Sequence, residues 1–111
     1  MTQETIQEVV ARFASDAQTV YGSALREVIL YGSCARGDFA SDSDIDILAL
    51  LDVPQDHISR ERKKMQEISN QLDLDYDVVL APVFQSAYIF DRYLPVSRYY
   101  QNVKTEGVRY A

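Results

Sequence analysis

Two apolar runs joined by a polar segment constrain the fold of this chain more than any other feature. The first run ends at Tyr31 and is followed by Gly32-Ser33, which is typical of a tight turn after a strand. The second run, Ile45 to Leu51, begins inside the sequence Asp44-Ile45-Asp46. The pattern predicts two buried strands, with a glycine turn after one and paired aspartates at the start of the other.

The two aspartates are expected to lie side by side. Residues two apart in a strand share a face, so Asp44 and Asp46 point one way while Ile45 and Ile47 point into the core. Adjacent carboxylates repel each other, and a hard divalent cation such as Mg²⁺, which prefers oxygen ligands, relieves that repulsion. A pair of solvated aspartates at an exposed strand end is the alternative interpretation.

The Gly32-Ser33 turn adds a second chemical element. Its backbone N–H groups have no bulky side chain in front of them, and a helix that begins there presents its positive dipole end, which suits a phosphate. A phosphate-binding turn together with metal-binding carboxylates is the minimal equipment for phosphoryl or nucleotidyl transfer.

These motifs carry a resemblance to a known family. Gly32-Ser33, ten residues and then Asp44-Ile45-Asp46 resemble the signature of the DNA-polymerase-β-like nucleotidyltransferases. The longer string, from Gly32 to Gly37 and from Ser43 to Leu48, resembles the minimal nucleotidyltransferases, MNT. The segment from Arg92 to Val108 is similar to the C-terminal part of these proteins. The resemblance implies an α/β (α+β) fold, the polymerase-β-like palm, in which one mixed sheet is flanked by helices and residues 1–111 form a single minimal nucleotidyltransferase domain.

Hydrophobic spacing and turn residues divide the chain into further elements. The pattern predicts helices over residues 3–21, 57–72, 86–93 and 96–105 and strands over 25–31, 44–52 and 74–81. Either Thr2 or Thr5 caps the first helix. The charged run Arg60 to Lys64 is interpreted as a solvated helix face, and Cys34 as a small space-filling residue.

A third acidic residue is expected on the strand predicted over 74–81. By alternation, Asp73, Asp75 and Asp77 would share one face of this strand. In the family that this chain resembles, the third metal carboxylate directly precedes a Val-Val or Leu-Val pair, which places the role on Asp77, with Asp75 as the alternative. Two Mg²⁺ need more than two carboxylates, and the third acid also serves as a base for the incoming hydroxyl.

The resemblance implies a complete set of site residues. Asp44, Asp46 and Asp77 are implied as the catalytic and metal-binding carboxylates, and Gly32 and Ser33 as the groups that hold the phosphates of ATP. Arg36 either contacts the triphosphate or pairs with Asp38 or Asp42.

Composition excludes several other classes of protein. The 111 residues are 47 % hydrophobic, which is enough for a packed core. A net charge of −6 argues against direct nucleic-acid binding, because phosphate neutralisation needs a basic surface. A single cysteine excludes an internal disulfide, and no apolar segment approaches the length of a membrane span. We therefore expect a cytoplasmic protein with no membrane association.

The resemblance implies an enzyme with a protein substrate. This chain resembles the stand-alone MNT antitoxins, which form a hetero-oligomer with a HEPN ribonuclease toxin. The resemblance implies a protein adenylyltransferase that transfers AMP from ATP to a tyrosine of that toxin. Two alternatives remain at this point. The chain either neutralises its toxin by binding alone, or modifies a small molecule such as an antibiotic.

Overall fold

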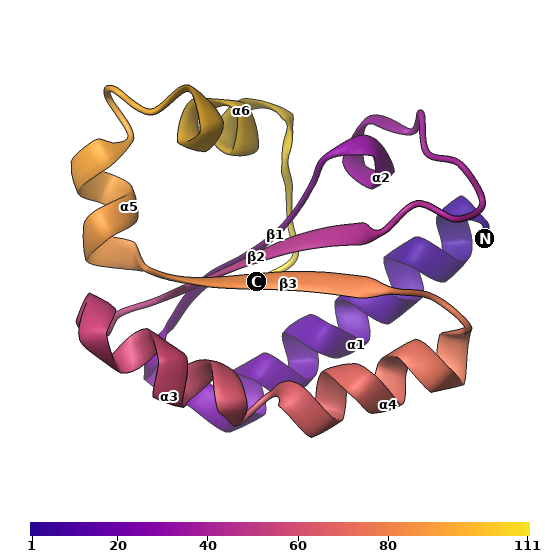
Figure 1. Ribbon diagram of the computed structural model, residues 1–111, viewed down its shortest axis with the longest axis horizontal. Helices are drawn as coiled ribbons and strands as arrows, with labels where there is room; N and C mark the ends of the chain where they lie inside the picture. The colour runs from indigo at the N-terminus through magenta and orange to yellow at the C-terminus, as the bar shows by residue number, and fades with distance from the viewer.

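A four-stranded mixed sheet runs through the middle of the molecule, between two layers of helices (Figure 1). In this computed structural model, which describes residues 1–111, the strands are β1 (Leu25–Tyr31), β2 (Ile45–Leu51), β3 (Leu80–Ser86) and β4 (Val108–Arg109). Their order is β3-β2-β1-β4. β1 is antiparallel to β2 and to β4, and β2 is parallel to β3. The expected mixed sheet is confirmed.

The helices are divided between the two faces of the sheet. One face carries α1 (Gln3–Tyr21), α3 (Ile58–Lys63) and α4 (Gln66–Tyr76) (Figure 1). The other carries α2 (Ser33–Arg36), α5 (Ala87–Tyr93) and α6 (Arg98–Glu106). Short 3₁₀ turns, Gly22–Ala24 and Gln55–His57, precede β1 and α3. None of these helices combines the length and the apolar character that crossing a membrane requires.

Strand alternation produces a separate core on each face. On the face of α1, the inward side chains of β1 and β2 join a cluster of 18 buried residues that includes Phe13, Leu30 and Ile47. On the opposite face, Ile29 and Leu48 belong to a cluster of 6 that α5 and α6 cover. The continuous apolar runs of β1 and β2 thus reflect strands that are covered on both faces.

Side-chain caps fix where the long helices begin. The hydroxyl of Thr2 accepts a hydrogen bond from the N–H of Thr5 at 3.1 Å, which decides the N-cap of α1 in favour of Thr2. Ser97 caps α6 in the same way, accepting from the N–H of Tyr100 at 3.2 Å. The boundaries of α1, α5 and α6 agree with the prediction to within two residues.

The prediction of a strand over residues 74–81 is wrong. Residues up to Tyr76 continue helix α4, Asp77 ends it in a left-handed conformation (φ 53°), and β3 begins only at Leu80. Buried Ser69 and Leu72 and partly buried Tyr76 follow helical spacing onto the core, and this longer period overrides the short acid–apolar alternation. Asp73, Asp75 and Asp77 therefore do not share a strand face.

The helix predicted over residues 57–72 is two helices. The chain breaks between α3 and α4 at Lys64 and Met65. The charged run before the break is exposed except for Glu61, which is 9 % exposed and lies 2.7 Å from the ammonium group of Lys64. The backbone carbonyl of Glu61 also accepts a hydrogen bond from the hydroxyl of Tyr21. This run is thus a solvated face with one acid turned inward.

Asp73 protects the free edge of the sheet. Its carboxylate accepts a hydrogen bond from the N–H of Leu80 at 2.9 Å, so this N–H points away from β2. Because backbone groups alternate along a strand, the next N–H on this edge would belong to position 82, which is Pro82 and has none. Two potential sites for pairing with another strand are therefore blocked.

Candidate active site

Asp44 and Asp46 lie at the start of β2, next to the end of β1. Asp46 is opposite Tyr31 in the antiparallel register, and the intervening Ile45 and the following Ile47 are fully buried on the other face. Burial raises the pKa of Asp46, the negative charge of Asp44 raises it further, and Arg36 opposes both effects. The predicted alternation is confirmed, because Ile45 and Ile47 are buried whereas Asp44 and Asp46 are not.

Gly32 brings the turn against this pair. Its φ is 73°, a conformation that favours glycine, and an added Cβ would collide with the carboxylate of Asp46, whose Cγ would lie 3.3 Å away. A side chain at this position would therefore be strained in its backbone and would displace the Asp46 carboxylate. The Gly32-Ser33 turn and the aspartates form one site.

Cys34 packs beneath the turn. Its side chain is fully buried, its sulfur lies 3.6 Å from the carbonyl oxygen of Asp44, and burial raises the pKa of the thiol. A buried thiol with a raised pKa is a poor nucleophile. This placement agrees with a space-filling role that holds the turn near the aspartates.

Arg36 links the turn to the C-terminal helix. Its guanidinium lies 3.3 Å from the carboxylate of Asp38 and 3.3 Å from that of Glu106 at the end of α6. Of the two partners expected from the sequence, the structure therefore selects Asp38 over Asp42, and it adds Glu106. The side chain is 45 % exposed, so it has room to turn toward a phosphate.

Asp77 stands apart from the other two carboxylates. It follows α4 and lies two residues before Val79, whose carbonyl accepts a hydrogen bond from the N–H of Ile45 at 2.9 Å. Asp77 therefore precedes the part of the chain that borders Asp44. However, the chain contains no group of three or more acidic, histidine or cysteine side chains that could hold a metal ion. Asp75 lies on α4 and accepts a hydrogen bond from Gln71.

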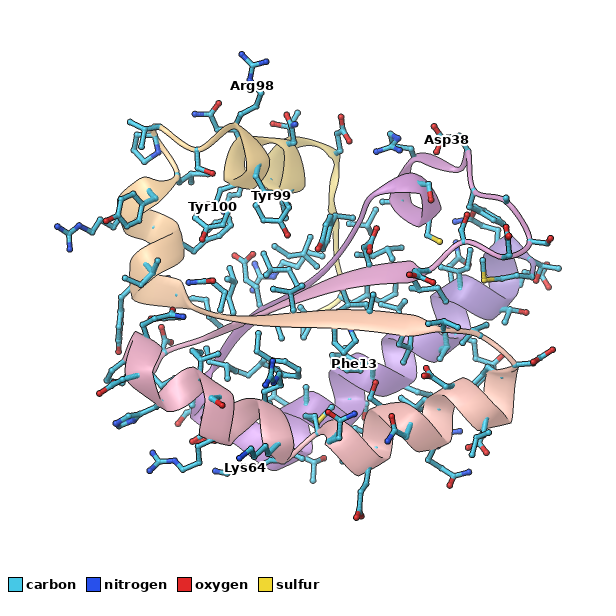
Figure 2. The ribbon with its side chains drawn as sticks, in the orientation of Figure 1. Phe13, Asp38, Lys64, Arg98, Tyr99 and Tyr100 are labelled. Carbon is cyan, nitrogen blue, oxygen red and sulfur yellow. The ribbon has the colours of Figure 1, made fainter.

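One wall of the site was not foreseen from the sequence. α6 faces the turn, and the hydroxyl of Tyr99 donates a hydrogen bond to that of Tyr31 at 2.9 Å. In Figure 2, Tyr99 and Tyr100 point from α6 toward the sheet, whereas Arg98 points away from it. A 180 Å³ pocket lies between α6 and the turn, lined by Tyr31, Gly32, Arg36, Tyr99, Asn102, Val103 and Glu106. The spacing 99, 102, 103 and 106, one face of a helix, was the signal in the sequence.

Comparison with known proteins identifies the family. The family model described as a nucleotidyltransferase domain matches residues 6–101, which include the turn, both aspartates and Asp77. The chain belongs to the nucleotidyltransferase family.

Two proteins of Methanocaldococcus jannaschii that carry the name "putative protein adenylyltransferase" are similar to this nucleotidyltransferase. MJ0141 is 36 % identical over 68 % of the chain and 75 % of its own length. MJ0604 is 31 % identical over 91 % of the chain and 93 % of its own length. The second match spans nearly the whole of both proteins, so the resemblance is not confined to the site.

Solved structures share the fold of this nucleotidyltransferase. A crystal structure of a toxin–antitoxin with AMP-PNP has a TM-score of 0.57, at 22 % identity over 91 % of this chain and 72 % of that one. A mutant of the toxin–antitoxin MntA-HpeT has a TM-score of 0.56, at 20 % identity over the same shares. The expected minimal nucleotidyltransferase fold is confirmed.

Proposed function

We propose that this nucleotidyltransferase transfers AMP from ATP, in a Mg²⁺-dependent reaction, to a tyrosine hydroxyl of a HEPN-type ribonuclease toxin and so acts as its antitoxin. The observation that carries the proposal is the contact between Gly32 and the Asp46 carboxylate, which joins a phosphate-binding turn to paired acids. The names of the two M. jannaschii relatives support a protein as acceptor. The toxin–antitoxin complexes that share the fold, one of them with AMP-PNP, support a toxin partner and ATP.

The carboxylate pair fits Mg²⁺. Asp44 and Asp46 offer hard oxygen ligands at the start of one strand. Burial, and then the charge of Asp44, raise the pKa of Asp46, and a bound cation would lower it again. No third acidic side chain joins this pair in the structure. We assign the third carboxylate to Asp77 on the family pattern alone, with Asp75 as the alternative. When bound, two Mg²⁺ would neutralise charge on the phosphates.

The protein groups supply position and proton transfer. Gly32 and Ser33 hold the triphosphate through the turn, and Arg36 exchanges its carboxylate partners for a phosphate oxygen. The acceptor oxygen forms a bond to the α-phosphorus of ATP. The bond between that phosphorus and the α,β-bridging oxygen breaks, and pyrophosphate leaves with the electron pair. The hydroxyl proton passes to a carboxylate, a role that we assign to Asp77.

A partner protein brings the acceptor hydroxyl in this proposal. The net charge of −6 does not favour a polynucleotide acceptor. We propose that residues 1–111 act as one catalytic unit within a hetero-oligomer with the toxin, in the cytoplasm.

Asp44→Asn tests the proposal against neutralisation by binding. The variant, the wild type and a matched control, Asp42→Asn, are each produced with the toxin encoded beside this chain. Asp42 is exposed, like Asp44, and lies two residues earlier in the loop before β2. Three properties are measured: complex formation by gel filtration, transfer of label from α-³²P-ATP, and growth.

The proposal predicts that Asp44→Asn still binds the toxin but loses both label transfer and protection of growth, whereas Asp42→Asn behaves as the wild type. Protection by Asp44→Asn without label transfer would establish neutralisation by binding instead. Absence of a complex with the wild type would point to a small-molecule acceptor.

A further inference from the structure

The pocket between α6 and the Gly32 turn is continuous with the proposed phosphate site, because Gly32 and Arg36 line both. Its volume of 180 Å³ is below the range of about 300–1,000 Å³ of pockets that enclose whole ligands. It is suited to one ring system of a larger ligand, whose other parts lie along the turn.

The walls of this pocket offer two kinds of contact. Tyr31 and Tyr99 provide aromatic surface, with their ring planes at 83° and their centroids 5.9 Å apart. Asn102 is an exposed residue that lines the pocket with its side-chain amide, whose N–H₂ group and carbonyl oxygen can each contact a ligand. An aromatic face and a side-chain amide are the groups that proteins use to bind a nucleobase.

The pocket is held in shape before any ligand arrives. Tyr99 is fixed by its hydrogen bond to Tyr31 and packs against Tyr100, whose ring lies 4.7 Å from that of buried Phe90. A preformed pocket avoids part of the ordering cost of binding.

We propose that this pocket binds the adenine base of ATP, with Tyr99 packing against the ring and Asn102 reading its edge. This assignment rests on the proposed function and names the residues that select the nucleotide. An amide pairs with adenine by accepting from the N6 amine and donating to N7. Guanine presents acceptors at both positions, so the carbonyl oxygen of Asn102 would face an oxygen and lose its partner.

The test is calorimetric titration of the chain with ATP, GTP and 7-deaza-ATP in the presence of Mg²⁺ and the absence of any acceptor. The wild type is expected to bind ATP about tenfold more tightly than 7-deaza-ATP or GTP. Asn102→Ala is expected to bind all three with the weaker affinity. Thr105→Ala, an exposed substitution on the same helix outside the pocket, is the matched control and keeps the wild-type preference.

Substitutions of Tyr99 separate ring contact from base recognition. Tyr99→Ala is expected to weaken ATP and GTP alike by about tenfold, whereas Tyr99→Phe keeps the ring and stays near the wild type. Circular dichroism confirms that each variant is folded.

Two results would overturn the assignment while leaving the proposed function intact: a wild type that binds ATP and GTP equally, or an Asn102→Ala variant that keeps the preference for ATP. If Asn102→Ala and Tyr99→Ala left the nucleotide affinities unchanged but raised the KM for the acceptor protein, the assignment would also be overturned, because the pocket would then bind the acceptor. No binding of ATP by the wild type would overturn the proposed function together with the assignment.

Discussion

At the scale of single residues, Gly32 brings the turn that we assign to phosphate against the carboxylate of Asp46. Gly32 and Gly37 both have positive φ, 73° and 87°, but only at Gly32 would a Cβ meet another group, the Asp46 carboxylate. Alanine substitutions at the two glycines therefore distinguish the effect of backbone strain, present at both, from the effect of a contact with Asp46, present only at Gly32.

We predict that Gly32→Ala destabilises the fold more than Gly37→Ala, which costs about 1 kcal/mol through strain alone. Gly32→Ala should also abolish Mg-ATP binding, because Asp46 must move away from the turn, whereas Gly37→Ala should retain it. Urea denaturation and calorimetry measure the two effects. Equal behaviour of the two variants would contradict a close approach of the turn to Asp46.

Asp77 and Asp75 form a second informative pair. If Asp77 is the base for the acceptor hydroxyl, Asp77→Asn should lower the rate of AMP transfer at saturating ATP and Mg²⁺ by roughly 100-fold or more. Asp75→Asn affects only an exposed hydrogen bond with Gln71 and should change the rate by less than about twofold. A larger loss in Asp75→Asn would exchange the two roles.

Tyr21 gives a pH-dependent prediction away from the site. Burial, with a smaller effect of Glu61, raises the pKa of its phenol to about 12. Because the folded-state pKa lies above the ordinary value, the stability from neutral Tyr21 is complete below pH 10 and is lost as the pH rises toward 12.

The urea midpoint of the wild type should therefore fall between pH 10 and pH 12. Tyr21→Phe, which carries no ionisable hydroxyl, should start lower and fall less over the same interval. Parallel curves for the two proteins would show that Tyr21 does not titrate with folding.

At the scale of elements, Asp73 joins the end of α4 to the edge of β3. Its carboxylate accepts the N–H of Leu80 at a position that no neighbouring strand covers. We predict that Asp73→Ala lowers the free energy of unfolding by about 1–2 kcal/mol, because a partly buried N–H loses its partner.

Asp75→Ala, at an exposed position two residues after Asp73 on the same helix, is the control and should cost much less. Urea denaturation measures both variants. A cost for Asp73→Ala no greater than that of the control would show that the edge N–H is satisfied by water instead.

Elements with long, consistent periodicity were predictable from the sequence, and short ambiguous ones were not. α1, β1 and β2 were expected almost at their observed bounds, because helical spacing or a continuous apolar run extends over each of them. The five residues Asp73 to Asp77 satisfy both helical and strand spacing, and only packing against α1 decides between them. β4, with two residues, has no pattern of its own and forms because Gly107 lets the chain pass close to Ile29.

At the scale of the whole molecule, the site combines local and distant parts. Asp44, Asp46 and Gly32 lie within one hairpin-like segment, so their spacing predicted their contact. Tyr99 and Glu106 meet Tyr31 and Arg36 across 68 and 70 residues, and only the folded topology brings α6 to the turn. The sequence therefore predicted the half of the site that we assign to phosphate, and the structure adds the half that we assign to the base.

The measurement that tests the central claim most directly is the intact mass of the toxin encoded beside this chain, after incubation with the chain, ATP and Mg²⁺. Our account predicts a gain of the mass of one AMP or a small multiple, located on tyrosine by fragmentation and lost with EDTA or in the Asp44→Asn variant. An unchanged toxin mass within a stable complex that still neutralises the toxin would contradict it.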